Sequence, residues 1–163
     1  MHKLHTRVAV LFLVLAICVP FAGYAASGIT SNVQGTATNG SRFVGSLTVT
    51  GFQLVNNAIV ATGNLVGTVF NNQGAPIGAV SQAVQVPLAS TSGTCTVLTL
   101  TLGPLDLNLL GLQVHLNQVV LTITANPAGG ILGQLLCDLA SGLNLNATLS
   151  QIVTLLNGIL AAL

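Results

Sequence analysis

The sequence predicts an α+β domain in which a curved antiparallel β-sheet is followed by a C-terminal helical hairpin packed on it. From about residue 33 to residue 124, apolar residues alternate with Thr, Ser, Asn and Gln, the two-residue period of half-buried strands. Beyond Gly130 they recur at helical spacing. Strands first and helices last is typical of an α+β domain. We expect about seven to nine strands, as a meander or a sandwich.

Residues 1–25 resemble a secretory signal peptide. A polar, positive start containing Lys3 and Arg7 precedes an apolar run, and Gly23 and Ala25 are the small residues that signal peptidase requires. The run is shorter than the roughly 20 residues of a membrane-spanning helix. We therefore expect cleavage after Ala25 and a secreted, extracellular or periplasmic protein. Residues 15–18 loosely resemble a lipoprotein box, and acylation of Cys18 is left open because Ile17 is bulky.

The remaining chain, residues 26–163, has the length of one domain, β-rich over 26–127 and helical over 128–163. Strands are predicted at residues 33–38, 42–52, 59–70 and 77–88. Turns are predicted at Asn39–Gly40, as type I′, at 56–57 and at 71–74, and Pro87 with the Ser/Thr-rich loop 89–94 ends the last strand. Glycines within these strands predict strong curvature.

Leucine-rich strands follow Cys95. The alternation covers residues 98–102, 105–109, 112–116 and 119–123. Its phase slips at Leu110 and near Gln118, and each slip predicts a bulge or a turn because a one-residue shift reverses the faces of a strand. Asn126–Pro127 ends the β-rich part.

Two helices complete the chain. The first contains Ile131 to Leu139 and is predicted to end at Gly142. The second is predicted to begin at Asn146 as N-cap and carries an apolar stripe to Leu163. Its polar face has no Lys or Arg, which favours packing on the sheet over binding at a membrane surface.

Cys95 and Cys137 are predicted to form a disulfide because exported proteins fold in oxidising compartments. In the chain-entropy model this cross-link contributes about 4 kcal/mol. A zinc site made of both cysteines, His115 and an aspartate is the weaker alternative, since no closely spaced ligand pair exists and the disulfide uses the same sulfurs.

Composition excludes several functions. The chain has 52% hydrophobic and 3% charged residues and a formal net charge of +1, which excludes disorder and leaves no basic surface for nucleic acid. Beyond residue 25 the ionisable side chains besides cysteine are Arg42, Asp106, His115 and Asp138. We interpret both aspartates and the histidine as surface residues and the phenylalanines as core. The sequence therefore predicts no catalytic, cofactor-binding or metal-binding residue.

The segment GPLDLNLLGLQVHLNQVVLTITANP at residues 103–127, together with residues 133–137 and the strand glycines, resembles a family of small secreted bacterial proteins of unassigned function. This resemblance implies secretion, the disulfide and a common fold. It supplies no catalytic or binding residue.

Two functions fit these features. The first is a non-enzymatic cell-surface or extracellular-matrix protein that self-associates or binds another surface, because neutral strand edges and near-zero charge favour association. The alternative is a carrier of lipid or another apolar small molecule held between sheet and helices. A hydrolase has the least support, since no Gly-x-Ser-x-Gly motif is present.

Overall fold

The structure, a computed structural model, describes residues 28–144 and 147–163. The predicted signal peptide, its cleavage site at Ala25, Cys18 and the proposed cap Asn146 lie outside the described residues.

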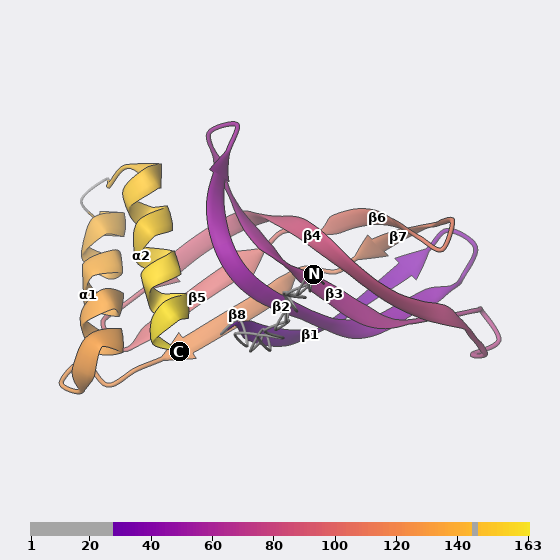
Figure 1. Cartoon of the computed structure of the whole chain (residues 1–163), viewed down its shortest axis with the longest axis horizontal. Coiled ribbons are helices and arrows are strands. Elements are labelled where there is room, and N and C mark those ends of the chain that lie inside the picture. The colour runs from indigo at the N-terminus through magenta and orange to yellow at the C-terminus, as the bar shows by residue number, and fades with distance from the viewer. Residues whose placement is uncertain (1–27, 145–146) are drawn as a thin grey trace, which may run out of the picture.

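The predicted α+β fold is confirmed. One antiparallel sheet of eight strands, in the order β6-β7-β1-β2-β3-β4-β5-β8, is followed by two helices. The strands are β1 (Ile29–Ala37), β2 (Arg42–Val55), β3 (Ala58–Phe70), β4 (Pro76–Gly93), β5 (Val97–Leu102), β6 (Leu105–Leu109), β7 (Leu112–Leu116) and β8 (Val119–Thr124). The helices α1 (Gly130–Asn144) and α2 (Leu149–Ala162) lie together at one end of the elongated, coiled sheet (Figure 1).

The core lies on the inner face of the coiled sheet. Alternate residues of each strand point inward, and the apolar stripes of both helices add Leu136, Leu139, Leu156 and Ile159. The largest inward side chain, Phe43, is fully buried. It lies over the cross-strand pair Gly45 and Gly67, where an added Cβ would come within 2.6 Å of the Phe43 ring. Glycine at this pair thus lets an aromatic ring cover the sheet.

The predicted turns at 56–57 and at Leu110 are present, and the turn at Asn39–Gly40 differs from the prediction in its type. Asn56–Asn57 and Leu110–Gly111 have positive φ at both residues, as a type I′ turn requires. At Asn39–Gly40 only the glycine has positive φ, and the Gly40 N–H donates to the Ala37 carbonyl. The type I′ prediction there is therefore wrong, since this geometry is a type I turn followed by a glycine bulge. The predicted phase slip at Leu110 is a hairpin turn.

Strand β4 does not end at Pro87, as the sequence had suggested. Pro87 is the last residue paired with β3, opposite Val60, and Leu88 is the first paired with β5, opposite Leu102. Proline has no N–H to donate to a neighbouring strand. The loss is small at Pro87 because β4 changes there from pairing with β3 to pairing with β5. The strand continues through a bulge at 88–90 to Gly93, so the predicted loop 89–94 is mostly strand.

The sheet curls so far that its two edge strands, β6 and β8, come close to other strands. No ladder of backbone hydrogen bonds joins them to those strands. Strand β6 lies near β4, and β8 lies near β1. Just before each edge strand, the chain is still hydrogen-bonded to its neighbouring ladder. Gly103 N–H donates to the Pro87 carbonyl at 2.8 Å and continues the β4–β5 pairing, and Asn117 N–H donates to the Gln34 carbonyl at 2.9 Å and continues the β1–β7 pairing. The phase slip near Gln118 is thus the connection by which the chain passes from β7 to β8.

The helix boundaries also differ from the prediction. Helix α1 continues past Gly142 to Asn144. Thr148 is the N-cap of α2, in a capping box with Gln151, which satisfies N–H groups that the first turn leaves free. In the part of the chain that the structure describes, neither helix is long and apolar enough to cross a membrane.

Asn157 of α2 attaches the helical hairpin to the sheet. Residues 50–55 of β2 extend beyond the end of β1, so this stretch lacks a neighbouring strand on one side. The Asn157 amide fills one position, accepting from Phe52 N–H at 2.8 Å and donating to the Phe52 carbonyl at 2.8 Å. A side chain 105 residues away in sequence therefore replaces a strand partner.

The predicted disulfide is present. Cys95, in the turn between β4 and β5, is bonded to Cys137 of α1, with Sγ atoms 2.01 Å apart. Helix α1 is thus covalently attached to the sheet, as α2 is attached through Asn157.

Replacing Asn157 should destabilise the fold. Asn157→Ala leaves the Phe52 N–H and carbonyl without a protein partner, which should lower the free energy of unfolding by about 1–3 kcal/mol. Urea denaturation measures this change. Thr154→Ala, at an exposed position of the same helix, is the matched control and should change stability little. Equal stability of the two variants would contradict the role given to Asn157.

Removing the disulfide should also destabilise the protein. Cys95→Ser with Cys137→Ser should lower the free energy of unfolding by about 4 kcal/mol, because the unfolded chain regains the entropy of the open loop. Denaturation of the oxidised protein and of this variant gives the difference. Alkylation before and after reduction, followed by mass spectrometry, is the control, and free thiols in the native protein would refute the pairing.

Candidate functional site

The structure brings Asp106 and His115 together. They lie opposite each other on β6 and β7, and Asp106 Oδ1 is 2.7 Å from His115 Nδ1. From the sequence, both were predicted to be surface residues, with no contact between them. The two-residue turn Leu110–Gly111 fixes this register, so the signal that was missed is a leucine-glycine hairpin turn.

This pair belongs to a longer row across the sheet. His115 lies opposite Thr36 of β1, Thr36 opposite Arg42 of β2, and Arg42 opposite Phe70 of β3. The Arg42 guanidinium carbon lies 5.6 Å from the centre of the Phe70 ring. We call Asp106, His115, Thr36, Arg42 and Phe70 the charged row. It lies at the end of the sheet away from the helices (Figure 1).

The charged row is open to water. The side chains of His115 and Asp106 are 53% and 76% exposed, and Thr36 and Arg42 are also exposed. A carboxylate, an imidazole and a hydroxyl in series have the composition of a hydrolytic triad. Such a triad also depends on oriented oxyanion donors in a site that excludes water, whereas this row lies on an open sheet face. The exposure of this row thus differs from the water-excluding site of such a triad.

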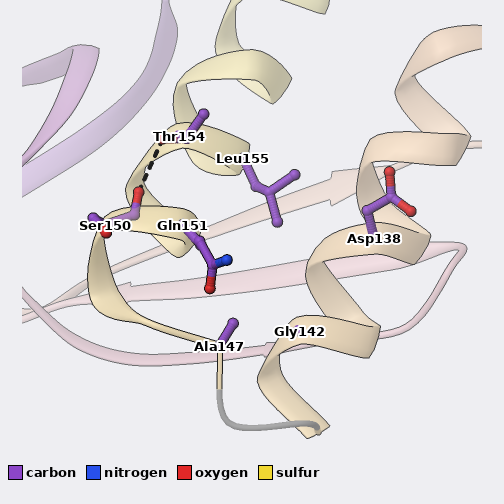
Figure 2. Close-up of a pocket in the computed structure, with 7 residues that line it drawn as sticks. All are labelled: Asp138, Gly142, Ala147, Ser150, Gln151, Thr154 and Leu155. Atoms are coloured by element: carbon purple, nitrogen blue, oxygen red, sulfur yellow. Dashed lines mark hydrogen bonds between the residues drawn. The ribbon is translucent and has the colours of Figure 1, made fainter.

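A groove on the helical hairpin contains Asp138. Its volume is about 530 Å³, and its lining residues are Asp138 and Gly142 of α1, then Ala147, Ser150, Gln151, Thr154 and Leu155 around the start of α2. Figure 2 shows the side chain of Asp138 on one helix and those of Gln151 and Thr154 on the other.

Small residues lie at one end of this groove. An added Cβ at Gly142 would lie 3.2 Å from Ala147 Cβ, so α1 is in close contact there with a residue that leads into α2. Thr154 Oγ1 donates to the Ser150 carbonyl at 2.9 Å, and Gln151 belongs to the capping box. These polar groups are already used within the helix. The charged group of the groove is thus the Asp138 carboxylate. Helix α1, which carries Asp138, lies far from strand β6, which carries Asp106 (Figure 1).

The zinc alternative has no support. Both sulfurs belong to the disulfide, and among the described residues no group of three metal-ligating side chains comes together.

The interior of the coiled sheet is filled. The void bounded by Val33, Leu47, Leu65 and Leu116 has a volume of about 10 Å³, roughly the space of one water molecule. This void cannot hold a lipid, so the alternative function of an apolar carrier has to rely on another site.

No family model, curated protein or solved structure matches this chain.

The Asp106–His115 pair should contribute little to stability. Asp106→Asn and His115→Gln, combined as a double-mutant cycle, should give a coupling energy below about 1 kcal/mol, because exposed ion pairs are weak. Urea denaturation at low and at high salt measures it, and salt should reduce the coupling. A larger, salt-independent coupling would mean that the charged row holds the β6–β7 hairpin in place.

Proposed function

We propose that the protein is exported and acts without catalysis at a cell surface or in the extracellular matrix, by self-association or by binding another surface. The observation that carries this proposal is the outer face of strands β1 to β4, where Arg42 at the start of β2 is the only charged side chain and the rows beyond it are uncharged. Two adjacent cross-strand rows on this face are Thr30, Thr48, Asn64 and Ala83, and Asn32, Ser46, Val66 and Ser81.

This face is suited to contact with another protein surface. Val66 is 51% exposed and Val44 is 42% exposed, and the register makes them diagonal neighbours, since Val44 lies opposite Thr68 and Val66 opposite Ser46. They form an apolar centre surrounded by hydroxyl and amide side chains. An apolar centre with a neutral polar rim is the usual composition of a protein interface, and the lack of like charges removes repulsion between copies.

Export is supported by two features. The first 25 residues have the pattern of a signal peptide, and a disulfide is typical of proteins in oxidising compartments. The resemblance to small secreted bacterial proteins agrees with this assignment.

A lysine in the centre of the outer face tests the proposed function. Sedimentation velocity over a range of concentrations should show association of the wild-type protein, and Val66→Lys should weaken it at least about tenfold by placing like charges at the contact. Because Val66 is exposed, the variant should keep the wild-type stability. Gln134→Lys, on the exposed side of α1, adds the same charge elsewhere and is the control.

The same proteins are then tested for binding to the cells that produce them. Intact mass of protein recovered from the medium should give a chain that begins at Ala26 and contains the disulfide. A strict monomer at high concentration that also fails to bind these cells would refute the proposal.

A further inference from the structure

A hydroxyl group lies unpaired among leucines beside the helical hairpin. Among the described residues, Thr91 Oγ1 is a buried side-chain atom that has no hydrogen-bond partner. Thr91 of β4 lies opposite Leu100 of β5, which lies opposite Leu121 of β8. The neighbouring inward rows are Leu88 with Leu102 and Val119, and Gly93 with Leu98 and Ile123. Thr91 thus occupies a position where the pattern of the sheet calls for an apolar residue.

Thr91 also lines a crevice between the sheet and the helices. The crevice has a volume of about 350 Å³. Its apolar walls come from Ile59 of β3, Leu88 of β4, Leu143 of α1, and Leu149 and Ile152 of α2, and Ser90 adds a second hydroxyl residue. The walls belong to elements that the disulfide and Asn157 attach to each other, so the crevice is part of the folded structure.

Thr91 and Ser90 are the polar side chains of the crevice, and its other lining residues are alanine, leucine and isoleucine. An unpaired buried polar group is destabilising, and a ligand that carries one hydrogen-bonding group on an apolar chain would match this lining. The lining residues carry no charge, which disfavours an ionised headgroup.

We propose that the Thr91 crevice binds a neutral amphiphile, with its alkyl chain against Ile59, Leu143, Leu149 and Ile152 and its polar group hydrogen-bonded to the Thr91 hydroxyl. The volume is at the lower end of ligand sites, which fits one short chain. Oγ1 is buried in the present rotamer of Thr91, so binding includes a rotation about χ1 that turns the hydroxyl toward the ligand. This inference is independent of the proposed surface association and gives an apolar ligand a site outside the filled sheet interior.

Decanol and decanoate test the proposal because they share a chain and differ in headgroup charge. Calorimetric titration of the folded, disulfide-bonded protein should show saturable binding of decanol and weaker binding of decanoate. Thr91→Val keeps the shape of the side chain and removes the hydroxyl. It should weaken decanol binding by roughly fivefold to tenfold, while Thr91→Ser should retain it.

The stability of the empty protein provides a second measurement. Thr91→Val should raise the melting temperature by roughly 3–10 °C, because it removes an unpaired buried hydroxyl. Thr99→Val, at a partly exposed position of the adjacent strand, should leave decanol binding unchanged. Absence of saturable decanol binding, or equal binding by the wild type and Thr91→Val, would overturn the proposal. A stabilised Thr91→Val with no decanol binding in the wild type would identify the hydroxyl as a packing defect only. Each result leaves the sedimentation test of surface association unaffected.

Discussion

The whole structure depends on the burial of one apolar face of a long antiparallel sheet. A flat sheet of eight strands would leave that face in water, so the strands coil until their inward side chains contact each other. Coiling of this degree needs positions without side chains, and the pair Gly45 and Gly67 beneath Phe43 is one such position. The helical hairpin covers the end of the sheet that coiling alone leaves open (Figure 1).

Coiling also shields the backbone groups of the edge strands. Edge strands with free backbone groups pair readily with other chains, and this chain has almost no charged residues to prevent such pairing. The edge strands instead face β4 and β1, and Asn157 covers a free stretch of β2. A nearly uncharged protein can therefore keep a neutral outer face while its backbone edges are shielded.

The chemical groups are divided among separate places. The charged row lies at one end of the sheet, and Asp138 and the Thr91 crevice lie at the other, beside the helices. The charged row brings Asp106, His115 and Arg42 into one exposed series of positions, whereas Asp138 lies apart on α1. Uncharged rows lie on the outside of the sheet, and a mainly apolar crevice lies beside the helices.

The sequence by itself determined the local structure. A period of two residues in alternating segments and of 3.6 beyond Gly130 specified strands and helices, because each element buries one face. Two cysteines beyond residue 25 predicted the pairing of Cys95 with Cys137, which the structure shows. The tertiary structure decided which residues meet when they belong to elements far apart in the sequence. Asn157 meets Phe52 across 105 residues, β4 exchanges β3 for β5 at Pro87, and Thr91 enters a row of leucines. These contacts arise from the order of strands in the sheet, which no local period encodes.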